Sequence, residues 1–354
     1  MTAVHFVVPD GIDDPGRPSG GNAYDRHVRQ GLGSLGWSVR VHAVTGCWPR
    51  PDAAAFAALA GVVRKIPDGA VALLDGLLAS TAPEVLVPAA RRLRLVVLVH
   101  MALGHRPAGD SDDTRMRERA VLSAAASVVT TSEWSRRRLL GLYELPPGRV
   151  HVALPGVESA ELASGTAAGR ALLCVAAVSF EKGHDVLLDA LLSLSALPWR
   201  CDCVGTLDRD PAFVGQLRRR ALDGGLADRV HFTGPLIASD LQSAYAGADL
   251  LVVASRAETY GMVVTEALSR GLPVVAAEVG GVAEALGYGA GRIRPGLLVA
   301  PGDPGAFAAA LGAWLCDDEL RARLRRAARE RRVSLCGWST TASIIAGVLA
   351  EASR

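Results

Sequence analysis

The chain has 354 residues, of which 50% are hydrophobic and 21% are charged. This length favours two domains, and this composition excludes a peptide, a small disulfide-stapled module and a wholly disordered chain. The formal net charge of +2 favours no class of partner, but of the 38 basic residues only Lys65 and Lys182 are lysine. Abundant arginine, alanine and glycine indicate codon bias in a GC-rich genome, so a retained lysine is of interest.

Over the first half of the chain, short apolar runs alternate with stretches of helical period. The apolar runs are continuous, as in parallel strands that are buried on both faces. The predicted strands are Val4–Val8, Ser38–Val44, Val71–Leu74, Leu93–Val99, Ser127–Thr131 and Val150–Ala153. The predicted helices are Asn22–Leu35, Ala53–Arg64, Pro83–Arg91, Asp113–Ala125 and Ser132–Leu140.

The alternation stops at residues 154–169, a stretch of small residues that we expect to be a linker, and then resumes. The second set of strands is Ala171–Val178, Arg200–Val204, Val230–Thr233, Leu250–Ala254 and Pro273–Ala276. The second set of helices is His184–Leu194, Pro211–Asp223, Ser239–Ala246, Met262–Arg270 and the chain from Pro304 onward. Two such runs predict two doubly wound α/β domains, which bind ligands at the carboxyl ends of their strands.

Several classes of protein are excluded by what the sequence lacks. The first residues have no basic and apolar segments of a secretory signal, and no apolar run approaches the roughly 18 to 20 residues that span a bilayer. We therefore expect a cytoplasmic protein, for which peripheral contact with a membrane stays open. The six scattered cysteines offer no ligand set at zinc spacing, and the dispersed basic residues do not resemble a nucleic-acid surface. The arginine-rich run 321–332 predicts a solvated helix face.

Two glycine clusters need different interpretations. Gly31 to Gly36 match the dinucleotide pattern G-x-G-x-x-G, but a predicted helix precedes them and a strand follows, which is the reverse of the required order. They therefore predict the end of a helix and a turn. The strand-to-helix turn is residues 9–21, which end in Ser19-Gly20-Gly21. Such glycines let backbone amides approach a phosphate or a sugar, although an ordinary flexible turn explains them equally well.

The segment 255–286 carries the clearest chemistry. Glu258 follows a predicted strand, and Glu266 comes eight residues later in the next helix. The free amides at that helix N-terminus favour an anion such as a diphosphate. Carboxylates suit vicinal hydroxyls, so the two glutamates could hold two polyols that flank the diphosphate. Either glutamate alone would be a cap or an exposed helical residue. The amides belong to Gly261, Met262 and Val263.

This segment closely resembles the E-x7-E region of the retaining glycosyltransferases of family four, which have the GT-B fold. Three further motifs resemble that family in the same order: Ser19-Gly20-Gly21, Pro155-Gly156-Val157 and Glu181-Lys182-Gly183. The resemblance implies an α/β chain of two facing Rossmann-like, doubly wound parallel-sheet domains with the active site in the interdomain cleft. Residues 1–156 would form the acceptor-side domain and residues 157–337 the donor-binding domain. A last helix, about 338–354, would pack back on the first domain.

The resemblance also implies roles for residues of the second domain. Glu266 would bind the ribose hydroxyls of the nucleotide, and Glu258 would bind hydroxyls of the donor sugar. Lys182 and the amides of residues 261–263 would hold the diphosphate. The other donor-binding residues of this turn would be Thr259 and Tyr260. One departure weakens the match: Ala177 stands where the family usually has a phosphate-binding arginine, for which Arg256 is a candidate substitute.

In the first domain, the resemblance places Gly20 and Gly21 near the phosphate and the acceptor. His100, which follows an apolar strand, would face the transferred sugar, although a satisfied histidine at a strand end explains it equally well. His105 and the polar loop 104–113 are candidates for the acceptor side. The catalytic set is therefore His100, Lys182 and Glu258, without a metal.

The leading hypothesis is retaining transfer of a sugar from a nucleotide-diphosphate sugar to an acceptor hydroxyl, with no cofactor. The acceptor could be a small molecule, a glycan or a lipid-linked sugar. A nucleotide-sugar epimerase or a phosphorylase on the same fold is an alternative. A non-catalytic nucleotide-sugar binder is another, suggested by Ala177 at the arginine position. A nicotinamide-dependent oxidoreductase is disfavoured by the context of Gly31 to Gly36.

Overall fold

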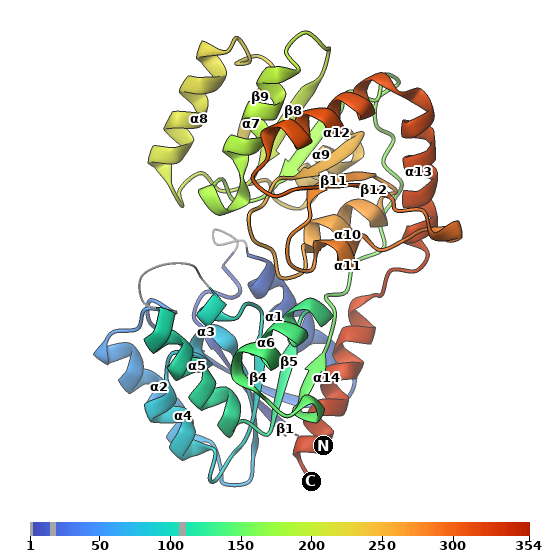
Figure 1. Cartoon of the computed structure of the whole chain (residues 1–354). Coiled ribbons are helices and arrows are strands. Elements are labelled where there is room, and N and C mark those ends of the chain that lie inside the picture. Colours follow the sequence, from blue (N-terminus) through green and yellow to red (C-terminus); the bar gives the residue numbers. More distant parts are fainter. Residues whose placement is uncertain (1–2, 15–18, 106–110) are drawn as a thin grey trace. The chain divides into compact units, whose positions relative to one another are not determined.

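The computed structural model describes residues 3–14, 19–105 and 111–354. The chain divides into two compact units, residues 1–156 with 336–354 (unit 1) and residues 157–335 (unit 2). In its described part, each unit contains a six-stranded sheet in which all neighbouring strands run parallel (Figure 1). The predicted α/β class with two doubly wound parallel sheets is therefore confirmed.

The sheet of unit 1 has the order β2-β1-β3-β4-β5-β6. Its strands are β1 (Ala3–Pro9), β2 (Ser38–Val44), β3 (Val71–Asp75), β4 (Arg94–Val99), β5 (Ser127–Thr130) and β6 (Val150–Val152). Its α-helices are α1 (Gly20–Ser34), α2 (Ala53–Lys65), α3 (Gly76–Ala79), α4 (Pro83–Ala89), α5 (Ser111–Ala124), α6 (Glu133–Tyr143) and α14 (Trp338–Ala352). Two 3₁₀ turns are η1 (Leu103–His105) and η2 (Pro147–Arg149).

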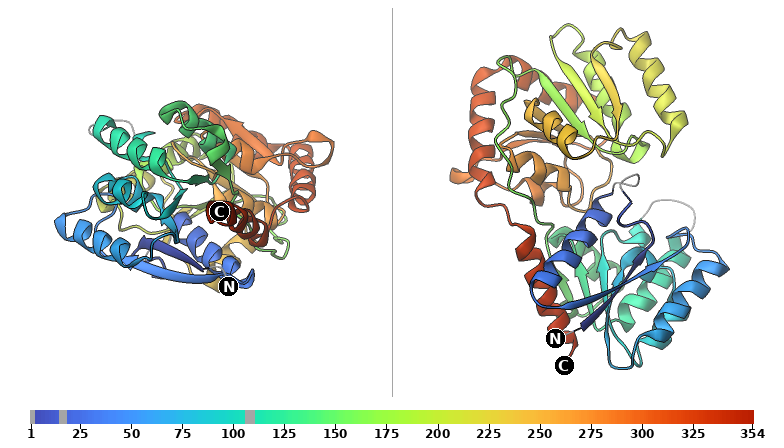
Figure 2. Two further views of the ribbon diagram at one scale, coloured as in Figure 1. Left: turned by 90° about the horizontal axis from the view of Figure 1, so that it is seen from below. Right: turned by 180° about the vertical axis from the view of Figure 1, so that it is seen from behind.

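Helices cover both faces of this sheet because successive side chains of a strand point to opposite faces. In β1, Phe6 lies in a buried cluster with residues of α1 and α14, whereas Val7 lies in a second cluster with residues of α2, α4 and α6. The last helix, α14, runs beside α1 (Figure 2). A Cβ at Gly31 of α1 would stand 2.4 Å from the Ala342 side chain, so these two helices pack closely.

The sheet of unit 2 has the order β12-β11-β10-β7-β8-β9. Its strands are β7 (Ala171–Val175), β8 (Arg200–Val204), β9 (Val230–Gly234), β10 (Leu250–Val253), β11 (Val274–Ala277) and β12 (Gly296–Val299). Its α-helices are α7 (His184–Ser193), α8 (Pro211–Asp223), α9 (Ala238–Ala246), α10 (Met262–Ser269), α11 (Val282–Leu286), α12 (Pro304–Cys316) and α13 (Asp318–Arg332). Its 3₁₀ turns are η3 (Phe180–Lys182) and η4 (Ala290–Arg292).

The strand orders locate one switch point in each sheet. Beside the first strand of each unit the order reverses, between β1 and β3 in unit 1 and between β7 and β10 in unit 2. Helices leave the sheet to opposite faces at such a point, and a crevice opens outside the carboxyl ends of the strands. These two strand pairs are therefore where ligand-binding side chains are expected.

The predicted strands and helices are all present, with ends that shift by a few residues. The glycines after Gly31 do end a helix: α1 stops at Ser34, and Gly36 has a φ of +84° in the turn before β2. Residues 154–169 contain neither helix nor strand, as the linker prediction requires. The structure adds α3, α11 and β12, which have four or five residues each and are too short to show a period.

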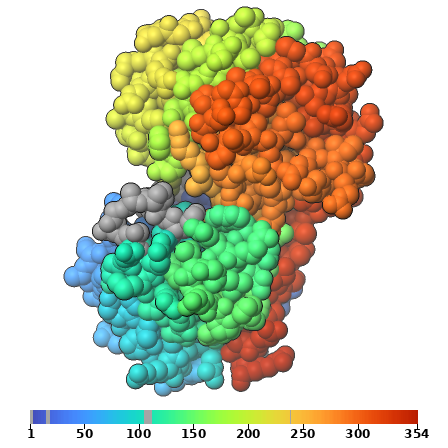
Figure 3. All heavy atoms as spheres, in the orientation of Figure 1, coloured from blue at the N-terminus to red at the C-terminus, as the bar shows by residue number. Residues whose placement is uncertain are grey.

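The arginine-rich helix α13 is also as predicted. Its buried residues are Leu320, Leu324, Ala327 and Ala328, which form one stripe. Its other face lies on the surface of unit 2, where it is orange-red in Figure 3. Among the described residues, no helix is both long and apolar enough to cross a membrane.

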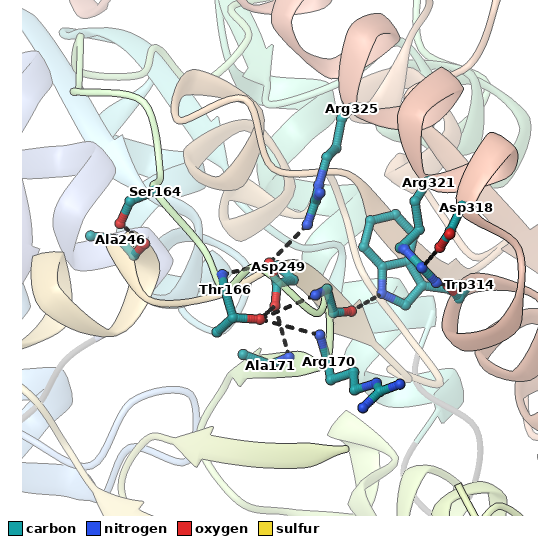
Figure 4. A network of polar contacts seen from close by, with 11 residues as sticks. Ser164, Thr166, Arg170, Ala171, Ala246, Asp249, Trp314, Asp318, Arg321 and Arg325 are labelled. Carbon is teal, nitrogen blue, oxygen red and sulfur yellow. Dashed lines mark hydrogen bonds and ion pairs between the residues drawn. The ribbon is translucent and has the colours of Figure 1, made fainter. Parts of the chain in front are cut away.

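A buried carboxylate ties the end of the linker to the sheet of unit 2 (Figure 4). Asp249, just before β10, has a fully buried side chain. It accepts hydrogen bonds from the Thr166 amide and hydroxyl at 2.9 and 2.5 Å, and from the Ala171 amide at 2.9 Å. The Arg325 guanidinium of α13 lies 2.8 Å away and supplies a positive charge. The linker, two strands and α13 therefore meet at one carboxylate.

Replacing Asp249 with alanine should lower the free energy of unfolding by about 3–5 kcal/mol, because buried amides and a cation lose their partner. Urea unfolding followed by tryptophan fluorescence measures this loss. Asp318→Ala is the matched control, since Asp318 is 87% exposed in its ion pair with Arg321 and should change stability by less than about 1 kcal/mol. Equal small losses for both variants would contradict the structural role of Asp249.

Candidate functional site

Lys182 and Glu258 meet at the switch point of unit 2. Lys182 ends η3, which follows β7, and Glu258 lies in the turn after β10. The Lys182 Nζ stands 2.5 Å from the Glu258 Oε1, and the Ser255 hydroxyl donates to the same oxygen at 2.8 Å. The two side chains are 27% and 14% exposed, so solvent reaches both. The structure thus pairs two residues that the sequence predicted as separate donor ligands.

The backbone brings the loops of these two residues into direct contact. Gly183 has a φ of +67°, and a Cβ there would stand 2.0 Å from the Ala254 carbonyl oxygen at the end of β10. The Arg256 amide donates to the Glu181 carbonyl at 2.8 Å. Only glycine combines this conformation with this close approach. The position of Lys182 therefore depends on Gly183.

Arg256 is engaged within unit 2 and does not extend as a free cation. Its guanidinium donates two bonds to the Asp185 carboxylate, at 2.8 and 2.7 Å, and one to the Phe180 carbonyl at 2.6 Å. Burial alone would raise the pKa of Asp185, but the bond and charge of Arg256 outweigh it and lower the pKa. The arrangement links α7 to the turn after β10. That Arg256 compensates for Ala177 stays a prediction.

The helix that follows Glu258 presents its N-terminus beside this pair. Gly261, with a φ of +90°, is the N-cap of α10, and the Val264 amide bonds back to the Gly261 carbonyl at 2.9 Å. The amides of Met262 and Val263 are among those that a helix leaves without an internal partner. The helix dipole adds to their attraction for an anion. Thr259 and Tyr260 form the turn between Glu258 and this N-terminus.

Glu266 lies on α10 and is held by a tyrosine that the sequence did not indicate. The Tyr245 hydroxyl, from α9, donates to the Glu266 Oε2 at 2.8 Å. Burial raises the pKa of Glu266, while this bond and the charge of Arg270 act in the opposite direction. The Arg270 guanidinium lies 4.4 Å from the centroid of the Tyr245 ring. Glu266 therefore has a fixed carboxylate oxygen within a packed polar cluster.

In unit 1, three predicted residues meet at the switch point. Gly20 and Gly21 form the first turn of α1, whose N-cap is Ser19, so they are helical and the expected glycine loop ends two residues earlier. The reason is that the Ser19 hydroxyl accepts from the Asn22 amide at 3.0 Å and starts the helix there. A Cβ at Gly21 would lie 3.4 Å from the His100 ring. His100 directly follows β4.

His100 contacts two carboxylates that the sequence did not indicate. Its Nε2 lies 2.9 Å from the Asp25 Oδ1, from α1, and 3.5 Å from the Asp75 Oδ2, at the end of β3. The Asp25 and Asp75 side chains are 1% and 5% exposed. Burial and the charge of Asp25 raise the pKa of Asp75 to about 7. Burial alone would lower the pKa of His100, but the charge and bond of Asp25 raise it.

The same three residues are the group of metal-ligand type among the described residues. Their ligand atoms lie within 4.8 Å of one another. The 2.9 Å contact between the His100 Nε2 and the Asp25 Oδ1 also has the length of a hydrogen bond, and with Asp25 ionised the proton of that bond belongs to Nε2. The geometry therefore favours a shared proton over a metal ion in this cluster.

The predicted acceptor-side residue His105 lies in η1, and its side chain is outside the described residues. The start of its turn is anchored by the buried Glu118 of α5. That carboxylate accepts from the Leu103 and Gly104 amides at 3.1 and 2.9 Å, and from the Ser80 hydroxyl at 2.7 Å. The loop after β4 thus begins at a fixed place.

Comparisons with known proteins point to one class of enzyme. The family model described as "Glycosyl transferases group 1" matches residues 169–317. The D-inositol 3-phosphate glycosyltransferase of Jonesia denitrificans is 33% identical over 258 residues, which cover 66% of this chain and 60% of that protein. The protein of the same name from Thermobispora bispora is 34% identical over 268 residues, which cover 69% and 61%. The chain thus spans about three fifths of the length of these curated relatives.

Solved structures agree over nearly the whole chain. Sucrose-phosphate synthase from Thermosynechococcus elongatus gives a TM-score of 0.80 at 20% identity and covers 99% of both chains. Anabaena HepE in complex with UDP and glucose gives 0.78 at 19% identity, with 99% of this chain and 100% of that chain covered. With its two six-stranded parallel sheets, the chain has the fold of these proteins, the GT-B fold.

Proposed function

We propose that this protein is a retaining glycosyltransferase that moves a sugar from a nucleotide-diphosphate sugar to an acceptor hydroxyl. One observation carries the proposal: Lys182, Glu258 and the α10 N-terminus lie together where the strand order of unit 2 reverses. A cation, free amides and a carboxylate are the groups that a diphosphate and a sugar require. The match of residues 169–317 to group 1 glycosyltransferases supports the same activity.

The residues of unit 2 would act mainly on the leaving group. Negative charge grows on the diphosphate as the glycosidic bond breaks, and prearranged donors stabilise it there. The Lys182 ammonium has three N–H donors, so it can keep its bond to Glu258 while it binds a phosphate oxygen. Glu258 would accept from sugar hydroxyls, and Glu266, fixed by Tyr245, would accept from ribose hydroxyls.

Retention would follow a front-face route. A phosphate oxygen of the donor takes the acceptor proton, and the acceptor oxygen bonds to the same face of the anomeric carbon that the diphosphate leaves. This route needs no protein nucleophile, metal or cofactor. His100, Gly20 and Gly21 are the residues that the family resemblance assigns to the sugar and acceptor side. Action in the cytoplasm stays a prediction.

A thermal-shift screen of common nucleotide-diphosphate sugars tests the proposal first. UDP-glucose, which a structural neighbour binds, belongs in the screen, and a true donor should raise the melting temperature by several degrees at about 100 times its Kd. Product analysis with D-inositol 3-phosphate, the substrate named for the curated relatives, should follow. Isomerised donor without an acceptor would indicate an epimerase instead. No shift with any donor and no product with any acceptor would contradict the assignment.

A further inference from the structure

The His100 cluster of unit 1 shows how a buried histidine is held in one state. Asp25 lies on the core-facing side of α1, beside the buried Tyr24 and Val28, where a hydrophobic side chain is expected. Asp75 ends the buried strand β3 and also accepts from the Leu77 amide at 2.6 Å. Three elements thus place two carboxylates and one imidazole at the switch point between β1 and β3.

The contacts indicate which ring nitrogen of His100 carries a proton. A carboxylate accepts hydrogen bonds, so the Nε2 that lies 2.9 Å from Asp25 and 3.5 Å from Asp75 must carry the proton. Asp25 is 1% exposed, and its second oxygen, Oδ2, has no partner among the described residues. A buried carboxylate needs a counter-charge, and His100 is the one cationic side chain that pairs with Asp25 in the described part of the chain. Asp75, whose pKa is raised to about 7, needs that counter-charge only above this pH.

The other ring nitrogen is left for a ligand. No described residue bonds to the His100 Nδ1, and the side chain is 16% exposed. Gly21 faces the opposite, Cδ2–Nε2 edge of the ring, where a Cβ would stand 3.4 Å from Cδ2. In a neutral imidazole with its proton on Nε2, Nδ1 is an acceptor, whereas in the imidazolium it is a donor. The charge state therefore decides whether His100 donates to or accepts from a substrate.

We propose that Asp25 and Asp75 are positioning residues that hold His100 as an imidazolium whose Nδ1–H donates to an oxygen of the bound sugar or its phosphate. This role rests on the proposed glycosyl transfer. Asp25 is the main partner through its direct bond, and Asp75 is the second partner at a longer distance. The groups that face His100 are these two carboxylates and the edge of the Tyr24 ring, so no other charged side chain among the described residues competes.

The test is Asp25→Asn, examined by NMR titration of the histidines and by the pH profile of turnover. His100→Gln assigns the His100 resonance. The parent His100 should titrate above its ordinary value of about 6.5, and Asp25→Asn should lower this pKa by at least one unit. The decrease of kcat/KM at high pH should shift to lower pH by the same number of pH units. At a pH above the His100 pKa of both proteins, kcat/KM of the variant should therefore be about 10-fold lower. Asp75→Asn should give a smaller shift of the same sign.

The matched control is Asp202→Asn. It removes a second histidine–aspartate contact of the same length, in which the Asp202 Oδ1 lies 2.9 Å from the His231 Nδ1. This contact is exposed and joins β8 to β9 in unit 2. It should leave the His100 titration and the pH profile unchanged. A parent His100 that titrates below about 6.5, or a pKa that Asp25→Asn and Asp75→Asn leave unchanged, would overturn the proposal. So would a shifted titration with an unmoved pH profile.

Two further outcomes are informative. If a chelator abolished turnover and a divalent cation restored it in the parent but not in Asp25→Asn, the cluster would be a metal site and the proposal would fall. If no donor gave turnover, the proposed function would fail, but the NMR titrations would still decide whether Asp25 and Asp75 hold the imidazolium. Should Asp25→Asn not fold, the parent and Asp75→Asn titrations decide the same question.

Discussion

Lys182→Ala should lower kcat of the proposed transfer by about 10²- to 10³-fold, the usual effect of removing one donor that stabilises a developing negative charge. The family that the sequence resembles has an arginine where this chain has Ala177, and Arg256 is bound to Asp185 and to the Phe180 carbonyl. Lys182 is therefore the main cation expected on the diphosphate. Its removal also leaves Glu258 with only the Ser255 hydroxyl as a described partner.

Steady-state kinetics with a donor found in the thermal-shift screen measures this effect. Lys65→Ala is the matched control because Lys65, the chain's other lysine, is exposed at the end of α2 and should leave turnover unchanged. Lys182→Arg keeps the charge and should recover part of the activity. Glu266→Ala should also lower kcat/KM, mainly through a higher KM for the donor. Near-parental kinetics for both Lys182→Ala and Glu266→Ala would refute the proposed site.

The sequence placed the predicted donor-side residues of α10 and its preceding turn in one local unit, because those residues lie close together along the chain. Glu258, Gly261 and Glu266 belong to one strand–turn–helix unit, so their spacing alone places them. Lys182 follows the first strand of the same sheet. The pairing of Lys182 with Glu258 was not predicted, since it depends on β7 and β10 being neighbours, which only the strand order shows.

The residues around His100 were missed for the same physical reason. Asp25, Asp75 and His100 come from three elements, and no local pattern connects them. Each aspartate nevertheless left a signal in the sequence. Asp25 interrupts the apolar stripe of α1, and Asp75 ends a wholly apolar strand just before a glycine. A charged residue at a position that must be buried indicates either a partner or a function.

Gly183→Ala should destabilise unit 2 strongly, although it adds only one methyl group. Its φ of +67° is unfavourable for alanine, and the new Cβ would stand 2.0 Å from the Ala254 carbonyl oxygen. Left-handed backbone costs alanine about 1–2 kcal/mol, and displacement of the loop from β10 adds to this cost. We expect a total loss of at least about 3 kcal/mol in the free energy of unfolding. Lys182 would move with the loop, so turnover should fall by about 100-fold.

Gly225→Ala separates the cost of the left-handed backbone from the cost of the close contact with Ala254. Gly225 has nearly the same φ, +69°, but no atom lies within 4 Å of the Cβ that alanine would add. It should therefore lose only about 1–2 kcal/mol and keep its turnover. Urea unfolding and kinetics on both variants measure the difference. If the two alanines cost the same stability and both left turnover intact, the close packing of the Lys182 loop against β10 would not be what positions this lysine.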